Sequence, residues 1–265
     1  ALEADALRTP FIGREEELAQ LVELFARARK GRAQVVSLTG EAGIGKSRLL
    51  AEFLRRLDAE GLLSQITLYH TACSALRTDA YQAIIDFLRI CFDLTAEESP
   101  AQARIKLTAV LQAIDAPTES IAPAIENLLG LTAQPSRLEH LDPEQFKRQL
   151  FLAVKEICQC QCRQHPVVWV VEDFHWADVA SIELLHSLID RVSDRPLMLL
   201  LVARPTAQLG TFYSANVDTT ALRLQPLSAE ESEILLTALV NPLGSLFQPA
   251  LRELVTRRAA GNPFF

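Results

Sequence analysis

A glycine-rich loop constrains the fold of this chain more than any other feature. The segment Gly40-Glu41-Ala42-Gly43-Ile44-Gly45-Lys46-Ser47 has the spacing Gly-x-x-x-x-Gly-Lys-Ser, between an apolar stretch at 35–39 and a helical pattern at 46–60. In a strand–loop–helix unit of this kind, glycines let backbone N–H groups face phosphate oxygens, and the helix N-terminus attracts anions. We therefore predict a phosphate-binding loop in which Lys46 contacts the β- and γ-phosphates and Ser47 offers a hydroxyl to Mg²⁺.

Further apolar stretches predict the remainder of an α/β fold. Strands are expected at 66–69, 167–171, 197–203 and 221–224, and helices at 181–192, 228–240 and 249–258. Continuous apolar strands that alternate with helices are typical of a mainly parallel sheet covered on both faces. We expect a sheet of about five strands, with a mostly helical insertion at 80–165.

Two adjacent acids, Glu172 and Asp173, follow the strand predicted at 167–171. Parallel strands gather ligands at their carboxyl ends, and a triphosphatase needs a carboxylate near Mg²⁺ and a group that activates water. By position Glu172 takes the metal side and Asp173 acts as the base. The usual pattern begins with Asp, so the two roles could be exchanged and both are candidate Mg²⁺ ligands with Ser47. An acidic helix cap is the alternative interpretation.

Arg204 ends the strand predicted at 197–203 and should point into the same crevice. A guanidinium there would sense or stabilise the γ-phosphate. The alternative is a surface arginine before Pro205.

The segment His175-Trp176-Ala177-Asp178 follows the two acids. Asp178 is expected to cap the next helix, although it could extend the acidic cluster. His175 is interpreted as a local hydrogen-bonding residue and Trp176 as a packing residue.

Composition narrows the possible partners. The net charge of −7 argues against strong nucleic-acid binding by this segment. No apolar run reaches the roughly 18 residues of a membrane span, and the N-terminus lacks a signal-peptide pattern.

The cysteines indicate a reducing compartment. Three of the five stand at Cys158, Cys160 and Cys162, a spacing that suits free thiols better than a zinc site. We therefore expect a cytoplasmic protein.

Together these motifs resemble the AAA+-related signal-transduction ATPases with numerous domains (STAND), which are P-loop NTPases. The resemblance is greatest to the predicted-ATPase modules of bacterial LuxR-type regulators and of proteins that carry adenylate/guanylate cyclase or kinase domains. The matching segments are Phe11-Ile12-Gly13-Arg14-Glu15, the glycine-rich loop with Arg48-Leu49-Leu50, Val171-Glu172-Asp173-Phe174-His175-Trp176-Ala177-Asp178, Leu200-Leu201-Val202-Ala203-Arg204-Pro205 and Gly261-Asn262-Pro263-Phe264.

The resemblance implies further site residues. In such modules the segment like Phe11–Arg14 lies beside adenine and ribose, a Gly-x-Pro element like Gly261-Asn262-Pro263 closes over the nucleotide, and the arginine like Arg204 is a sensor. It also implies ATP rather than GTP. The expected nucleotide-binding residues are thus Phe11, Ile12, Gly13, Arg14, Gly40, Glu41, Ala42, Gly43, Ile44, Gly45, Lys46, Ser47, Arg48 and Pro263; the expected catalytic residues are Lys46, Glu172, Asp173 and Arg204.

The resemblance also implies an organisation and a function. Residues 1–225 would form the nucleotide-binding domain and 226–265 a truncated helical lid, with effector domains outside the chain. The expected function is a regulatory switch that binds ATP with Mg²⁺, hydrolyses it slowly and self-associates according to its nucleotide. An AAA+ DNA-handling ATPase of the replication-initiator type is the main alternative; a P-loop kinase and a binding module without turnover are also considered.

Overall fold

The computed structural model describes residues 10–77, 79–131, 142–205, 216–240 and 249–264. At its centre lies a five-stranded sheet in the order β2-β3-β4-β1-β5, in which every neighbouring pair is parallel. The prediction of an α/β fold with a parallel sheet is confirmed. The strands are β1 (Gln34–Thr39), β2 (Thr67–Ala72), β3 (Val167–Glu172), β4 (Leu197–Ala203) and β5 (Asp218–Arg223).

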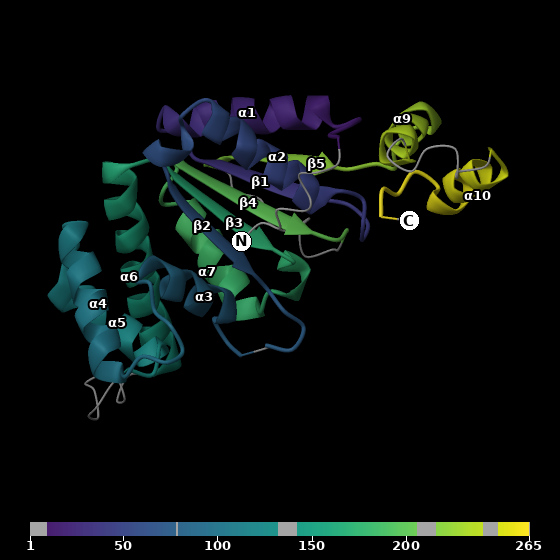
Figure 1. Cartoon of the computed structure of the whole chain (residues 1–265). Coiled ribbons are helices and arrows are strands. Elements are labelled where there is room, and N and C mark those ends of the chain that lie inside the picture. The colour runs from purple at the N-terminus through teal and green to yellow at the C-terminus, as the bar shows by residue number, and fades with distance from the viewer. Residues whose placement is uncertain (1–9, 78, 132–141, 206–215, 241–248, 265) are drawn as a thin grey trace.

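Helices cover both faces of the sheet (Figure 1). Alternate residues of each strand point to opposite faces, so Val168 and Val170 join one apolar cluster while Val167, Trp169 and Val171 join the other. The first cluster packs under α1 (Glu15–Arg29) and α2 (Lys46–Ala59); the second packs under α3 (Gln82–Cys91), α6 (Pro143–Gln164) and α7 (Val179–Ile189).

The two edge strands differ from their predicted positions. The strand expected at 66–69 lies at Thr67–Ala72, and the one expected at 221–224 lies at Asp218–Arg223. The central strand β4 is buried at every position, whereas β2 and β5 are only partly buried. A search for apolar runs therefore locates central strands well and misplaces edge strands, whose polar residues face solvent.

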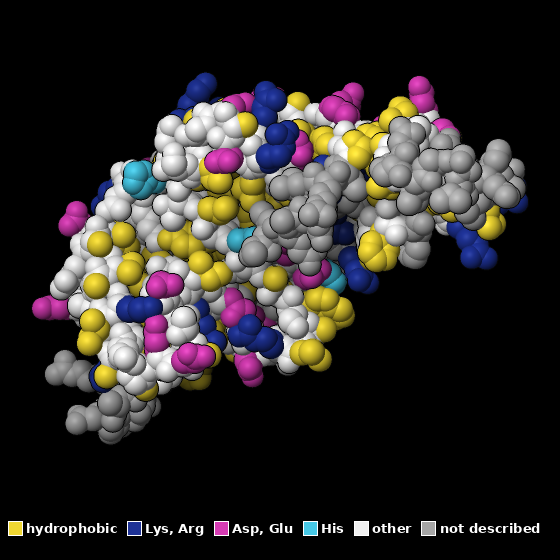
Figure 2. All heavy atoms as spheres, in the orientation of Figure 1, with side chains coloured by type: hydrophobic (Ala, Val, Ile, Leu, Met, Phe, Trp, Pro, Cys, Tyr) yellow, Lys and Arg dark blue, Asp and Glu magenta, His cyan; other side chains and the backbone are white. Residues whose placement is uncertain are grey.

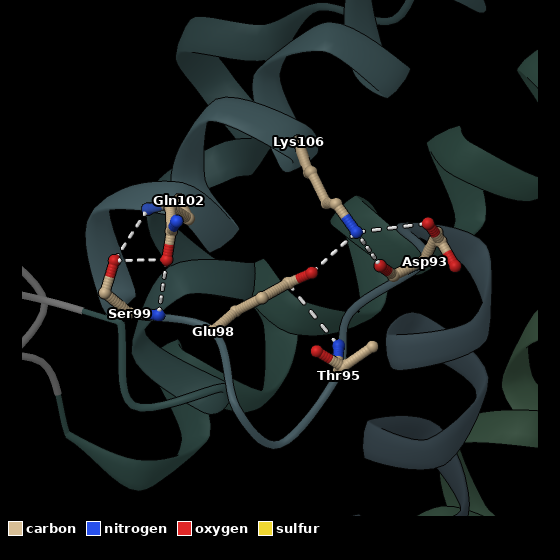
Figure 3. A network of polar contacts seen from close by, with 6 residues as sticks. All are labelled: Asp93, Thr95, Glu98, Ser99, Gln102 and Lys106. Atoms are coloured by element: carbon tan, nitrogen blue, oxygen red, sulfur yellow. Dashed lines mark hydrogen bonds and ion pairs between the residues drawn. The ribbon is translucent and has the colours of Figure 1, made fainter.

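In the described ranges, four helices lie between β2 and β3. They are α3, α4 (Pro100–Ala113), α5 (Thr118–Leu128) and α6. The connection between α3 and α4 is held by polar contacts (Figure 3). The Lys106 ammonium pairs with the Asp93 and Glu98 carboxylates, and Ser99 and Gln102 form a capping box at the start of α4.

The last two described helices stand apart from the sheet. Helices α9 (Ala229–Val240) and α10 (Pro249–Ala259) pack on each other beyond the sheet edge to which the strand arrows point (Figure 1). After α10 the chain turns back, and the Leu227 N–H donates to the Gly261 carbonyl at 2.8 Å. This contact ties the end of the described chain to the segment that joins β5 to α9.

None of the helices in the described ranges is long and apolar enough to cross a bilayer.

Trp176 and the cysteines of α6 have different environments. Trp176 is 49% exposed on a short 3-10 turn, η3 (Phe174–Trp176), so the expectation that it is a packing residue is wrong.

Cys158, Cys160 and Cys162 are buried, and burial raises the pKa of Cys162 to about 12. A protonated thiol is a poor metal ligand, which agrees with the interpretation of free thiols.

Asp178 caps two helices at once. Its Oδ1 accepts from the N–H groups of Ser181 at 2.8 Å and Tyr81 at 2.9 Å; its Oδ2 accepts from the Ser181 hydroxyl at 2.6 Å and the Gln82 N–H at 3.0 Å. The two Ser181 groups lie in the first turn of α7, and the Tyr81 and Gln82 N–H groups lie at the start of α3, so the capping interpretation of Asp178 is confirmed.

Replacing Asp178 by Ala is expected to lower the free energy of unfolding by about 2–3 kcal/mol, because two helix starts lose their cap. Urea denaturation measures the difference. Glu97→Ala, at an exposed acid, is the matched control and should change stability by no more than about 0.5 kcal/mol. Equal effects of the two substitutions would contradict the double cap.

Candidate functional site

The glycine-rich loop connects β1 directly to α2. Gly43 and Gly45 adopt left-handed backbone angles, with φ of 78° and 104°, which residues with a side chain rarely adopt. The Lys46 ammonium donates to the carbonyl oxygens of Gly40 and Glu41, each at 2.8 Å. The first turn of α2 contains no acidic residue. No carboxylate within that turn therefore offsets the partial positive charge of the helix N-terminus.

Lys46 lies in a strongly charged environment. Partial burial lowers its pKa, and the Arg204 guanidinium acts in the same direction, while Asp173, Glu41 and Glu172 oppose the shift. Arg204, Glu172 and Asp173 therefore all lie within electrostatic reach of Lys46. Three segments distant in sequence thus meet at one sheet edge, as predicted.

The Ser47 hydroxyl donates to Glu172 Oε2 at 2.9 Å. This bond joins the loop after β1 to the carboxyl end of β3, although the two strands are separated in the sheet by β4. A hydroxyl and a carboxylate are oxygen ligands of the kind that Mg²⁺ prefers. The residues present therefore fit the metal that the loop pattern implies.

His70 holds the other oxygen of this carboxylate. Its Nε2 lies 2.6 Å from Glu172 Oε1, and it comes from the neighbouring strand β2. The hydrogen bond from His70 is the largest cause that lowers the pKa of Glu172, with a further contribution from Ser47 and opposition from burial. Glu172 is therefore ionised at neutral pH and accepts from both neighbours, which leaves its carboxylate one orientation.

Asp173 is much more exposed than Glu172. Its side chain is 61% exposed, and its backbone is left-handed with φ of 51°. His175 Nδ1 lies 4.0 Å from Asp173 Oδ1, and the same nitrogen accepts from the Arg204 backbone N–H at 3.5 Å. Burial lowers the pKa of His175 more than Asp173 raises it, so the ring is neutral at neutral pH. His175 thus makes a long hydrogen bond to the residue after β4, whereas its buried Nε2 has no hydrogen-bond partner among the described residues.

A cavity of about 240 Å³ adjoins the loop. Most of its walls are apolar, which suits the flat ring of a base. Eight predicted nucleotide-binding residues line it: Phe11, Ile12, Arg14, Gly43, Ile44, Gly45, Arg48 and Pro263. Sequence reasoning missed the other five, which are Pro10, Leu227, Leu235, Leu239 and Phe264.

Two predicted residues at the N-terminal side of this cavity contact the segment that leads into α9. The Arg14 guanidinium donates to the Gln225 carbonyl and to Glu17 Oε1. Gly13 has φ of 70°, and a Cβ there would lie 2.5 Å from Glu231 Oε1. Gly13 is therefore placed against α9 rather than in the cavity wall, and Arg14 both lines the cavity and holds residue 225.

His70 and Asn262 are polar residues of the site that sequence reasoning left without a role. The predicted strand 66–69 ended before His70, and a single histidine carries little signal. Asn262 stood within a matching motif, but its contact, with the Ala42 carbonyl at 2.8 Å, joins residues 220 positions apart. Only the tertiary structure reveals such a contact.

A family model described as the AAA ATPase domain matches residues 10–202. An uncharacterized protein of Rhizobium meliloti (strain 1021) is 28% identical over 257 residues, which cover 97% of this chain and 24% of that protein. Hybrid signal transduction histidine kinase G of Dictyostelium discoideum is 21% identical over 192 residues, which cover 70% of this chain and 5% of that protein. The chain therefore spans about a quarter or less of the length of these relatives.

A solved structure of Drosophila ORC bound to DNA has a similar fold. Its TM-score is 0.56 at 15% identity, and the match covers 96% of this chain and 53% of that chain. At this identity the likeness shows the fold alone, and it agrees with the α/β sheet described above.

Replacing His70 by Ala is expected to weaken divalent-metal binding on the order of tenfold, because Glu172 loses the group that orients it. Titration with Mn²⁺ in the presence of ADP, followed by electron paramagnetic resonance, measures this. His70→Gln retains a donor and should recover part of the loss. His165→Ala, at an exposed histidine, is the matched control; equal titrations of His70→Ala and His165→Ala would contradict the orienting role.

Proposed function

Because the chain belongs to the AAA ATPase domain family, we propose that it is an ATP-binding, slowly hydrolysing switch module of a longer signal-transduction protein. The observation that carries the proposal is the 2.9 Å bond between the Ser47 hydroxyl and the Glu172 carboxylate. It unites the phosphate-binding loop with the acidic strand end, the two parts that phosphoryl transfer requires.

Five polar residues of the site have a direct role in this proposal. The Lys46 ammonium binds β- and γ-phosphate oxygens, and the Arg204 guanidinium binds the γ-phosphate. Ser47 and Glu172 hold Mg²⁺, which neutralises phosphate charge when bound. Asp173 accepts a proton from the attacking water. Its charge contributes to the field at Lys46, which supports a position close to the phosphates.

Slow hydrolysis is supported by the exposure of the proposed base. The Asp173 side chain is 61% exposed, whereas an efficient site excludes bulk water from the reacting groups. A long-lived bound nucleotide suits a switch, in which the bound state itself carries the signal.

The walls of the cavity support the switching part of the proposal. Phe11 and Ile12 come from the segment before α1, whereas Leu235 and Pro263 come from the region of α9 and α10. A base bound between these walls would contact both, so its binding would favour one arrangement of the two. We propose that the nucleotide-binding domain comprises 1–225 and the lid 226–265, with the Arg14–Gln225 contact at their boundary.

The relatives support a place within a larger protein. This chain corresponds to a small part of each, and one of them is named as a signal transduction histidine kinase. We propose that effector domains outside this chain carry the output, and that the bound nucleotide controls self-association.

A DNA-handling role is the second candidate, since one structure with this fold is that of ORC bound to DNA. The net charge of −7 opposes it. On the face in Figure 2, acidic and basic side chains are interspersed rather than gathered into one basic patch. Salt-dependent DNA binding by this chain would favour the second candidate.

Wild-type protein is expected to release phosphate from ATP at a rate below about 1 per second, the slow end of enzyme turnover. Asp173→Ala should reduce this rate by about 100-fold because it removes the general base, while ADP affinity stays within about threefold. Absence of phosphate release from the wild type would refute the ATPase assignment.

Lys46→Ala is expected to abolish or strongly weaken ADP binding in calorimetry. Unchanged ADP affinity in this variant would refute the assignment of the phosphate-binding loop.

Arg204→Ala is expected to leave ADP affinity within about threefold and to weaken binding of a non-hydrolysable ATP analogue by about tenfold or more, the contribution of one charged hydrogen bond. Calorimetry with both nucleotides measures the two affinities. Arg89→Ala, at an exposed arginine in the last turn of α3, serves as the control. Equal losses for both nucleotides would remove the γ-phosphate role.

A further inference from the structure

The segment that follows α10 reaches back to the phosphate-binding loop. The Asn262 Nδ2 group donates to the Ala42 carbonyl at 2.8 Å, and Asn262 Oδ1 accepts from the Phe264 N–H at 3.1 Å. The Ala42 carbonyl is an acceptor and the Phe264 N–H is a donor, so only one orientation of the Asn262 amide satisfies both. In that orientation the NH₂ group faces the loop.

This approach is close enough to exclude a side chain at the central glycine of the loop. A Cβ on Gly43 would lie 2.7 Å from Phe264 Cβ and 2.8 Å from Asn262 Oδ1. Gly43 also has a left-handed φ of 78°. Glycine is therefore required there both by the turn of the loop and by the contact with Asn262 and Phe264.

The neighbours of Asn262 keep its backbone in place. Gly261, with φ of 80°, packs on the segment before α9, since a Cβ there would lie 2.8 Å from Pro226 Cβ. The Gly261 carbonyl accepts from Leu227 N–H at 2.8 Å. On the other side, Pro263 restricts the conformations available to Asn262. In the Gly-Asn-Pro motif, the glycine thus anchors the segment, the asparagine reaches the loop, and the proline restricts the backbone of the asparagine.

The contact also orients a backbone group of the loop. The Lys46 ammonium engages the Gly40 and Glu41 carbonyls, and Asn262 engages that of Ala42. In a planar trans peptide the C=O and the following N–H point in opposite directions. The Gly43 N–H therefore points away from Asn262. Loops of this kind bind phosphate through such N–H groups.

We propose that Asn262 is a positioning residue that holds the 42–43 peptide of the phosphate-binding loop and thereby couples the lid to nucleotide affinity. The inference rests on the proposed nucleotide site and gives that site a regulatory link. Coupling of this kind is reciprocal. When the lid moves away from the loop, the protein binds nucleotide less tightly, and a bound nucleotide draws the lid toward the loop.

Two substitutions test the link. Asn262→Asp keeps an acceptor for the Phe264 N–H but loses the donor to Ala42, whereas Asn262→Ala removes both contacts and introduces no charge. Arg258→Ala, at an exposed position of α10, is the matched control. The measurements are ADP affinity by calorimetry and hydrogen–deuterium exchange of residues 40–45 and 254–264, with and without ADP. Exchange of β3 and β4 reports whether each variant is folded.

Both Asn262 variants are expected to bind ADP about threefold to tenfold more weakly, the effect of one lost hydrogen bond. Their loop amides should exchange faster than wild type without nucleotide, and ADP should protect residues 254–264 less. Arg258→Ala should match the wild type. An ADP affinity within twofold of wild type in both variants would overturn the inference, even if 254–264 exchanged faster, because that pattern marks a purely structural contact. A wild-type chain that binds no ADP would overturn the proposed site together with this inference.

Discussion

The parallel alignment of β3, β4 and β1 is the constraint on which the site depends. Because β4 pairs with both neighbours in the same direction, the three strands end at one edge of the sheet. At these ends lie the loop that leads to Ser47, the acids Glu172 and Asp173, and Arg204. Reversing one strand would place its functional residue at the opposite edge, so the sheet topology itself assembles the site.

The loop is held from two sides. From within, Lys46 engages the Gly40 and Glu41 carbonyls; from the region of α10, Asn262 engages the next carbonyl. Glycine permits both the left-handed turn at residue 43 and the approach of Asn262. Two constraints therefore act on residues 42 and 43. One is the left-handed backbone of Gly43, and the other is the contact of Ala42 with Asn262, 220 positions away.

Contacts with the region of α9 recur at the opposite wall of the cavity. Arg14 donates to the Gln225 carbonyl, and Gly13 lies against Glu231. A resemblance in sequence marks Gly13 and Arg14 as nucleotide contacts, yet both also touch the segment that joins the sheet to α9 and α10. Any shift of this segment therefore alters the contacts of both residues.

The sequence by itself determined the phosphate-binding loop, the central strands, the acid pair and the arginine, because each is a local pattern of spacing or apolar continuity. It located β2 only approximately, since an edge strand lacks an apolar run, and His70 therefore fell outside the predicted strand. Only the tertiary structure decided that His70 orients Glu172, that Asp178 caps two helices and that Asn262 reaches Ala42. Each of these contacts joins residues from separate elements, and their distances are set by how the helices and strands pack rather than by any local spacing.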